Sequence, residues 1–175
     1  MYIHLSIQVI ILSYRLSFDA IALSAYILNK NEYIPFDPST VIGKSTELII
    51  PNGRLNDYGN GTFRISNNEN LKQILIGNNC LGNVRVFDLD GLSELENMVI
   101  GERSVRIGSS ERSDGDFRIV NCPKLKYIQI GYESIQDYHS FELNNLLSLQ
   151  SIVLGDRCFN WVPLFSLTGL TVSLI

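Results

Sequence analysis

From residue 63 onward, apolar residues recur at a spacing much longer than the period of a helix or a strand. Phenylalanine marks the repeat, with steps of 24, 30, 24 and 24 residues between Phe63, Phe87, Phe117, Phe141 and Phe165. An aliphatic residue follows two positions later each time, at Ile65, Leu89, Ile119, Leu143 and Leu167. A unit of this size cannot bury its own apolar face, so the pattern predicts a stack of coils that cover one another.

A second apolar phrase, L-x-x-I-x-I-G, follows each phenylalanine phrase. Its two central positions are filled by Ile74 and Ile76, Met98 and Ile100, Ile128 and Ile130, and Ile152 and Leu154. A period of two indicates a strand with alternate side chains buried, and the F-x-(L/I) phrase has the same period. The sequence therefore predicts a mainly β fold, a solenoid with two short strands per coil of about 24 residues and parallel stacked sheets.

Turn residues follow both predicted strands. Glycine follows the I-x-I strand at Gly77, Gly101, Gly131 and Gly155. Asparagine or glycine follows the F-x-(L/I) strand at Asn67, Gly91, Asn121, Asn145 and Gly169. Because both residue types tolerate left-handed backbone, we expect both corners of the coil to use it at these positions.

Charged residues also repeat, and their sign alternates from one unit to the next. One row, beside the phenylalanines, reads Arg64, Asp88, Arg118, Glu142 and Ser166. A second row reads Lys72, Glu96, Lys126 and Gln150. Opposite charges on neighbouring strands stabilise the pairing by roughly 0.2 to 1 kcal/mol each, whereas like charges oppose it. Both rows are therefore expected to fix the register of the stack.

The repeat divides the chain into two parts. Residues 46–175 are the predicted solenoid of four to five coils, beginning with a degenerate unit at Thr46 to Pro51. The last unit lacks its I-x-I strand, so we expect it to be incomplete at the C-terminus and open to end-to-end self-association. Residues 1–45 are interpreted as an N-terminal capping or non-repeat segment. Their apolar spacing fits strands and a helical stripe equally, and a targeting segment is the alternative.

Composition and charge narrow the classes of partner. The chain has 175 residues, of which 45% are hydrophobic and 18% are charged, and its net charge is −4. This composition is globular and lacks the basic field that binds nucleic acid. A membrane span within residues 1–45 would have to contain Arg15 and Asp19, which disfavours a membrane location. The sequence leaves open whether the chain is cytoplasmic or at the cell surface.

The three cysteines fall on rows of the repeat. Cys80 and Cys158 share a row with Ser104 and Ser134 and lie three coils apart, about 14 Å at the strand spacing, which is too far for a disulfide. Cys122 lies in a row of leucines, so we expect it to be buried. Three free thiols fit a reducing compartment and are also compatible with secretion.

Few residues are candidates for catalysis, nucleotide binding or metal binding. Residues 38–45, PSTVIGKS, end like a phosphate-binding P-loop, but Pro38 stands where that loop needs glycine, so a nucleotide-binding enzyme is a remote alternative. His4, His139 and the cysteines show no spacing for a catalytic triad or a metal site, so no catalytic, cofactor-binding or metal residues are expected. We expect His139 in a surface turn. Asn60-Gly61-Thr62 is a glycosylation acceptor sequence, which matters only for an exported chain.

The repeat resembles a leucine-rich repeat in its full motif, L-x-x-L-x-x-I-x-I-G-x-x-S/C-F/L. The motif is most complete from Leu146 to Phe159. The spacing and the extra F-x-L segment are similar to the bacterial surface-antigen subtype, which is also found in protists. The resemblance covers Thr46 to Leu170 and departs from the subtype by placing glycine, instead of proline, after the strand. It implies an adhesion or protein-binding surface and brings no catalytic residues.

We therefore expect a non-catalytic protein–protein interaction module, a scaffold or adhesion surface whose partner is another protein; an exported cell-surface adhesin is the alternative. The binding face is predicted on and beside the I-x-I strands, at Gln73, Leu75, Asn97, Val99, Lys126, Tyr127, Gln129, Ser151 and Val153. Its apolar members would form an exposed stripe, with Tyr127 and Lys126 as anchors. A second candidate surface is the polar insertion Ser109 to Asp116, which lengthens one unit to 30 residues.

Overall fold

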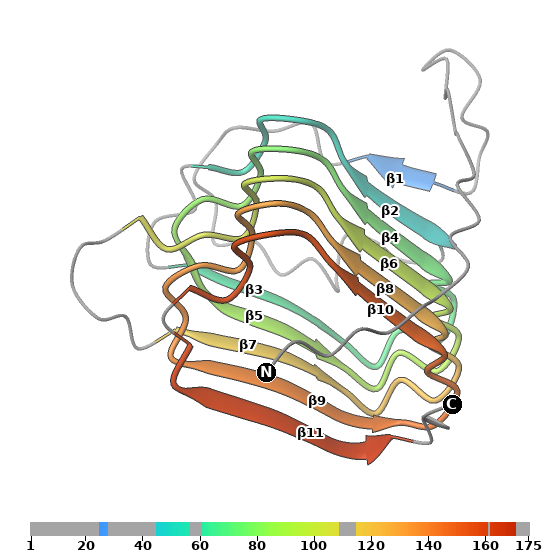
Figure 1. Cartoon of the computed structure of the whole chain (residues 1–175). Helices are drawn as coiled ribbons and strands as arrows, with labels where there is room; N and C mark the ends of the chain where they lie inside the picture. The colour runs from blue at the N-terminus through green and yellow to red at the C-terminus, as the bar shows by residue number, and fades with distance from the viewer. Residues whose placement is uncertain (1–24, 28–44, 57–60, 109–114, 161, 171–175) are drawn as a thin grey trace.

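The computed structural model describes residues 25–27, 45–56, 61–108, 115–160 and 162–170. They form a β-solenoid of about five turns, whose coils stack into two parallel sheets on either side of one core (Figure 1). The prediction of a mainly β fold with two strands per coil is confirmed. None of the described ranges contains a helix, and hence none contains a helix able to cross a membrane.

Sheet A contains the I-x-I strands, with every strand parallel to its neighbour. In spatial order its members are β1 (Ala25–Ile27), β2 (Glu47–Ile50), β4 (Gln73–Ile76), β6 (Asn97–Ile100), β8 (Tyr127–Ile130) and β10 (Ser151–Leu154). Equivalent repeat positions pair, so that Ile74 faces Met98 and Met98 faces Ile128. β1 belongs to the segment before the repeat and extends the sheet by one strand beyond β2.

Sheet B contains the phenylalanine strands, again all parallel. Its members are β3 (Gly61–Ser66), β5 (Val84–Asp90), β7 (Asp116–Val120), β9 (Ser140–Leu146) and β11 (Leu164–Leu170). Gly61 and Thr62 of the glycosylation acceptor sequence begin β3, whereas Asn60 lies outside the described residues. The P-loop-like sequence also lies outside them, apart from its last residue, Ser45.

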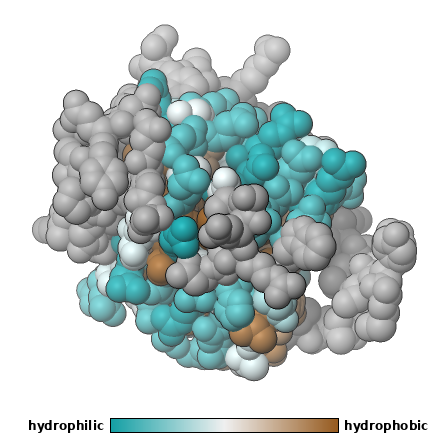
Figure 2. Space-filling model, turned by 90° about the vertical axis from the view of Figure 1, so that its left-hand side faces the viewer, coloured by the Kyte–Doolittle hydropathy of each residue, from teal (hydrophilic) through white to brown (hydrophobic). Residues whose placement is uncertain are grey.

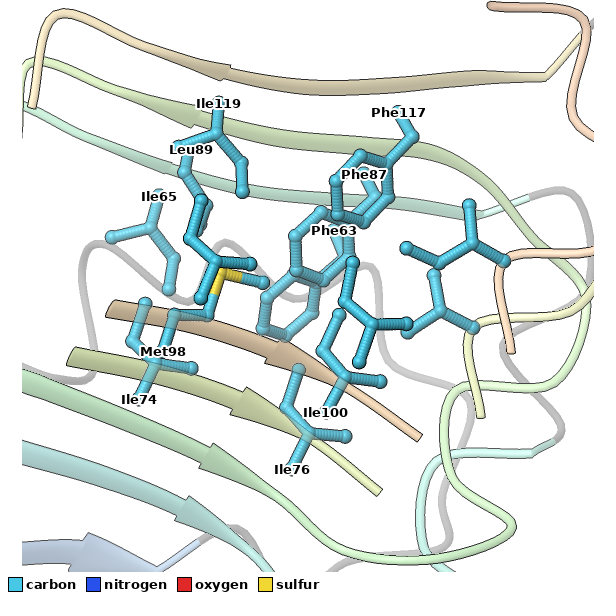
Figure 3. Close-up of a cluster of buried hydrophobic side chains, with 14 of the residues drawn as sticks. Phe63, Ile65, Ile74, Ile76, Phe87, Leu89, Met98, Ile100, Phe117 and Ile119 are labelled. Atoms are coloured by element: carbon cyan, nitrogen blue, oxygen red, sulfur yellow. The ribbon is translucent and has the colours of Figure 1, made fainter. Parts of the chain in front are cut away.

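The phenylalanine row forms one continuous column of stacked rings in the core. Successive ring centroids from Phe63 to Phe165 are 5.2, 4.7, 5.1 and 4.8 Å apart, and the ring planes lie within 15° of parallel. In Figure 3 the rings of Phe63, Phe87 and Phe117 follow one another, with aliphatic side chains of both sheets beside them. Such aromatic pairs contribute about 0.5 to 1.5 kcal/mol beyond their burial, so the column supports the register of the coils.

The two corners of the coil use glycine for different reasons. At the C-terminal ends of the sheet B strands the expected left-handed backbone is present, with φ between 53° and 69° at Asn67, Gly91, Asn121, Asn145 and Gly169. After the sheet A strands the prediction is wrong, because φ is not positive at Gly77, Gly101, Gly131 or Gly155. A Cβ at Gly131 would lie 2.7 Å from the Glu102 amide nitrogen. Glycine is needed there because consecutive coils approach too closely to admit a side chain.

In the turns after the sheet A strands, the left-handed conformation is adopted instead by residues other than glycine. One row has φ between 52° and 58°, at Asn79, Arg103, Glu133 and Arg157, and a second has φ between 53° and 59°, at Leu81, Val105, Ile135 and Phe159. This conformation costs of order 1 to 3 kcal/mol for a bulky residue. The side chains of Leu81, Val105 and Ile135 are fully buried, and burial of roughly 1.5 to 3 kcal/mol each offsets the strain.

Cysteine and serine form a hydrogen-bonded ladder just inside the sheet A turns. The Ser104 hydroxyl accepts the Cys80 N–H at 3.0 Å, and the Ser134 hydroxyl accepts the Ser104 N–H at 3.1 Å. Cys80, Ser104, Ser134 and Cys158 each donate at 2.7 to 3.1 Å to one carbonyl of the preceding coil, at Pro51, Gly77, Gly101 and Gly131 respectively. As predicted, Cys80 and Cys158 are free, and Cys122 is free and buried.

The charge row beside the phenylalanines is a continuous ladder, as predicted. Arg64 Nε lies 2.9 Å from Asp88 Oδ2, and the other oxygen of Asp88 lies 3.4 Å from Arg118 Nη1. Arg118 Nε continues the ladder to Glu142 Oε2 at 3.2 Å. The ladder therefore links the outer faces of β3, β5, β7 and β9 across every coil boundary between them.

The base of the insertion belongs to the packed structure. Asp116 begins β7, so the expected polar bulge ends earlier than predicted, and residues 109–114 lie outside the described ranges. A Cβ at Gly115 would overlap the Ile107 side chain and lie 3.3 Å from the Tyr138 ring. That ring is buried, meets Phe117 edge-on at 6.2 Å, and donates its hydroxyl hydrogen to a carbonyl oxygen in β5.

Candidate protein-binding face

The outward residues of β4, β6, β8 and β10 form two straight rows. The first row is Gln73, Asn97, Tyr127 and Ser151, and the second is Leu75, Val99, Gln129 and Val153. In-register pairing thus brings each predicted residue beside its equivalent in the next coil, about 4.8 Å away. Lys126, the ninth predicted residue, directly precedes β8.

The exposed members of both rows lie in the C-terminal coils. Gln73, Asn97, Leu75 and Val99 are half-buried, so an apolar stripe fully open to solvent is not present at this end. Tyr127 is 48% exposed, Gln129 is exposed and Val153 is 38% exposed. Ser151 is 8% exposed and presents little surface. The accessible part of the face is therefore the outer surface of β8 and β10.

Neighbouring coils hold both predicted anchors in place. The Tyr127 hydroxyl donates to Gln150 Oε1 at 2.9 Å, one coil further on. Lys126 Nζ donates to Glu96 Oε2 at 2.8 Å, one coil back, and this hydrogen bond raises the pKa of Lys126 and lowers that of Glu96. A tyrosine fixed in this way offers a large amphipathic surface without much conformational entropy to lose on binding.

A second group of surface residues, on the turns after sheet A, was not predicted from the sequence. Tyr132 lies between two guanidinium groups, with Arg103 at 5.6 Å and Arg157 at 5.9 Å from its ring centroid. Glu133 joins the same arginines, at 3.1 and 3.3 Å. Arg103, Glu133 and Arg157 occupy one repeat position, so their alternating charge would have identified this third ladder. The side of the molecule that carries these turns is mainly hydrophilic (Figure 2).

The described residues include three free thiols and one histidine. The three thiols are hydrogen-bonded to backbone carbonyls, and burial raises the pKa of Cys80 and Cys158 and that of Cys122 to about 11. The nucleophilic thiolate is therefore disfavoured. His139 lies exposed in the turn before β9, as predicted. Within the described ranges, no three His, Cys, Asp or Glu side chains are grouped so as to hold a metal ion.

Comparisons with protein-family models, with curated proteins and with solved structures find no match to this chain. The repeat and the exposed surface are consequently the basis for inferring a function.

Proposed function

We propose that the chain is a non-catalytic protein-interaction module of the leucine-rich-repeat type, which binds another protein through the outer surface of β8 and β10. The observation that carries the proposal is the exposed group of Tyr127, Gln129 and Val153 on a rigid, in-register sheet. Tyr127 and Val153 are diagonal neighbours on adjacent strands, because Tyr127 pairs with Ser151 and Val153 pairs with Gln129. An aromatic and an aliphatic residue with polar groups between them are a composition typical of binding hot spots.

Rigidity favours this surface over the turns. The backbone of β8 is hydrogen-bonded to β6 on one side and to β10 on the other, so its outward side chains are already ordered before a partner arrives. Ordering a mobile side chain on binding costs about 0.5 to 1.5 kcal/mol, and this sheet avoids much of that cost. The assignment to leucine-rich repeats is supported by the recurrence of L-x-x-I-x-I-G with its strand on the I-x-I residues.

Site-specific photo-crosslinking tests the proposal. A benzophenone amino acid at Gln129 should capture a defined partner, whereas the same group at Glu102, exposed in the turn after β6, should not. With that partner purified, Tyr127→Ala should weaken binding at least about tenfold, because removing a hot-spot aromatic costs more than about 1.4 kcal/mol. Equal capture at both positions, or an affinity that Tyr127→Ala leaves unchanged, would exclude this face as the binding site.

A further inference from the structure

The turn after β2 contains an Asn-Gly pair, Asn52-Gly53, that has no part in the proposed binding face. Both residues are exposed, and Gly53 has left-handed backbone with φ of 71°. The sequence has a second such pair, Asn60-Gly61, but Asn60 lies outside the described residues. An asparagine before glycine is the one most open to attack by its own backbone, because glycine has no Cβ to block the approach.

This attack leads to deamidation, which consumes only water. The backbone nitrogen of Gly53 attacks the side-chain carbonyl carbon Cγ of Asn52, so an N–Cγ bond forms and the Cγ–Nδ2 bond breaks. The proton of the Gly53 N–H leaves with the side-chain NH2 as ammonia. Water then opens the cyclic imide at one of its two carbonyls and gives aspartate or isoaspartate. The exposure of the turn gives water access to the imide.

In the folded chain both reacting groups are held by one residue of the next coil. Asn52 Oδ1 accepts the N–H of Asn78 at 2.8 Å. The N–H of Gly53 donates to the carbonyl oxygen of the same Asn78, also at 2.8 Å. We call these two hydrogen bonds the clamp. The side chain of Asn52 has to rotate, and the nitrogen of Gly53 has to give up its proton, so both hydrogen bonds must break before the imide forms.

Further contacts between the two coils keep the clamp closed. The Cys80 thiol donates to the carbonyl oxygen of Pro51 at 3.1 Å. The Gly77 N–H donates to the carbonyl oxygen of Ile50 at 2.8 Å, where β2 and β4 lie side by side (Figure 1). A Cβ at Gly77 would overlap Asn52 Oδ1 and lie 2.7 Å from the Asn52 nitrogen. The turn of residues 51–54 can therefore release Asn52 only by moving away from the second coil.

The same clamp recurs one coil later without the glycine. Asn78 Oδ1 accepts the N–H of Glu102 at 2.8 Å, and the N–H of Asn79 donates to the Glu102 carbonyl oxygen at 2.8 Å. Asn79 has φ of 53°, so its backbone is also left-handed. The pair Asn78-Asn79 thus differs from the first pair chiefly in the side chain that follows the asparagine, and it provides an internal control.

We propose that Asn52 is a modification site, and that its deamidation is controlled by opening of the turn of residues 51–54 from the following coil. Surface turns open locally at a lower free energy than the whole fold, so the reaction does not require complete unfolding. Isoaspartate adds one methylene group to the backbone where Gly77 admits no further atom. The product cannot close the clamp as before, so the modification permanently records that the turn has opened.

Peptide mapping of the full chain by mass spectrometry tests the proposal. Trypsin releases residues 45–54, in which Asn52 is the single asparagine, and exchange of NH2 for OH raises the mass of this peptide. In mildly alkaline buffer Asn52 should react at least about tenfold faster in the urea-unfolded chain than in the folded one, which corresponds to an opening free energy of about 1.4 kcal/mol. In urea Asn78 should react more slowly than Asn52, because Asn79 has a side chain.

Two glycine variants separate opening of the turn from unfolding of the whole chain. Gly77→Ala should displace the turn and raise the rate at Asn52 in the folded chain at least about fivefold, a modest effect for overpacking against backbone. Gly131→Ala is the matched control, since its Cβ would lie 2.7 Å from the Glu102 nitrogen at another coil boundary, and it should leave this rate unchanged. Cys80→Ala, which removes the donor to Pro51, is the second variant in case Gly77→Ala fails to fold. Circular dichroism establishes that each variant is folded.

Three outcomes would overturn the proposal. Equal rates at Asn52 in the folded and the unfolded chain would show that the clamp does not protect the side chain. Equal rates at Asn52 and Asn78 in urea would remove the role of Gly53. Equal increases for Gly77→Ala and Gly131→Ala would assign the reaction to unfolding of the whole chain. None of these measurements involves a partner, so they are independent of the proposed binding through Tyr127.

Discussion

The glycines that follow the sheet A strands lie where consecutive coils approach most closely. Their backbone does not need the left-handed region, which the chain reaches two residues later at positions occupied by asparagine, arginine and glutamate. A Cβ at Gly101 would lie 2.6 Å from the carbonyl carbon of Gly77, a contact that backbone atoms cannot relieve by rotation. These glycines therefore set the distance between coils.

Replacing Gly101 separates this steric requirement from backbone strain. Gly101→Ala should destabilise the fold by about 1 to 3 kcal/mol, the usual cost of overpacking, because the added methyl group meets backbone. Gly53 is the control, since it has φ of 71° and nothing within 4 Å of a built Cβ. Gly53→Ala should cost only about 1 kcal/mol, for the left-handed conformation. Urea unfolding measures both, and a larger loss for Gly53→Ala would contradict the steric explanation.

Serine and cysteine share one row, at Cys80, Ser104, Ser134 and Cys158, because the position needs a small side chain that donates a hydrogen bond. Ser104 connects three coils. Its hydroxyl accepts the N–H of Cys80 and donates to the carbonyl of Gly77, both in the preceding coil. Its backbone N–H donates to the hydroxyl of Ser134 in the following coil. Burial raises the pKa of the Cys80 thiol, which keeps that thiol protonated and able to donate.

Two substitutions at Ser104 test this role. Ser104→Ala leaves the buried N–H of Cys80 and the partly buried carbonyl of Gly77 without this partner, and loss of a buried hydrogen-bond partner costs about 1 to 3 kcal/mol. Ser104→Cys should be clearly milder, because cysteine already fills the row at Cys80 and Cys158. Thermal unfolding of the two variants gives the comparison, and equal losses would mean that the hydrogen bonds contribute little.

At the scale of the elements, the strands and their pairing were predictable because they depend on periodic side chains. The phenylalanine and I-x-I rows predicted the two sheets. The alternating charges of Arg64, Asp88 and Arg118 predicted which residues pair between neighbouring strands. Turn geometry was less predictable, since glycine can meet either a steric or a conformational need. The exposure of the candidate face was not predictable at all, because Leu75 and Val153 have the same pattern yet differ in burial according to their place in the stack.

The insertion can be removed without breaking a coil. Deleting residues 109–114 shortens its unit from 30 to 24 residues, the length with which the neighbouring units already close. It keeps Ile107, Gly115 and Tyr138, which pack together. We expect the free energy of unfolding to change by less than about 1 kcal/mol, since closing a shorter loop costs less entropy.

Extending the same deletion through Asp116 is the control. That longer deletion removes Gly115 and the first residue of β7, and it should cause a much larger loss in urea unfolding. Similar losses for both deletions would show that residues 109–114 themselves stabilise the fold.

For the whole molecule, stability should fall at alkaline pH. Burial raises the pKa of the Cys122 thiol from about 9 to about 11, so the folded state holds this proton more tightly than the unfolded state does. The corresponding stability is fully present below about pH 9 and is lost as pH rises towards about 11, by up to roughly 3 kcal/mol. Burial raises the pKa of Tyr138 in the same direction.

Urea unfolding at several values between about pH 8 and about pH 11 measures this loss. Cys122→Ala should be less stable at neutral pH but show a smaller decline, because its titrating group is gone. All other ionisable groups are the same in both proteins, so their contribution cancels in the comparison. An identical decline in the variant would show that Cys122 does not control the alkaline transition.

If each coil is stabilised mainly by its two neighbours, a substitution in a middle coil should lower the free energy of unfolding more than the same substitution in the last described coil. The ring of Phe117 stacks on Phe87 and Phe141 and is fully buried, whereas Phe165 stacks on Phe141 at one side and is 53% exposed. Phe117→Ala should cost about 3 to 5 kcal/mol, the usual value for a buried phenylalanine. Phe165→Ala should cost less than half as much. Equal losses in urea unfolding would mean that the last described coil is as well packed as the centre.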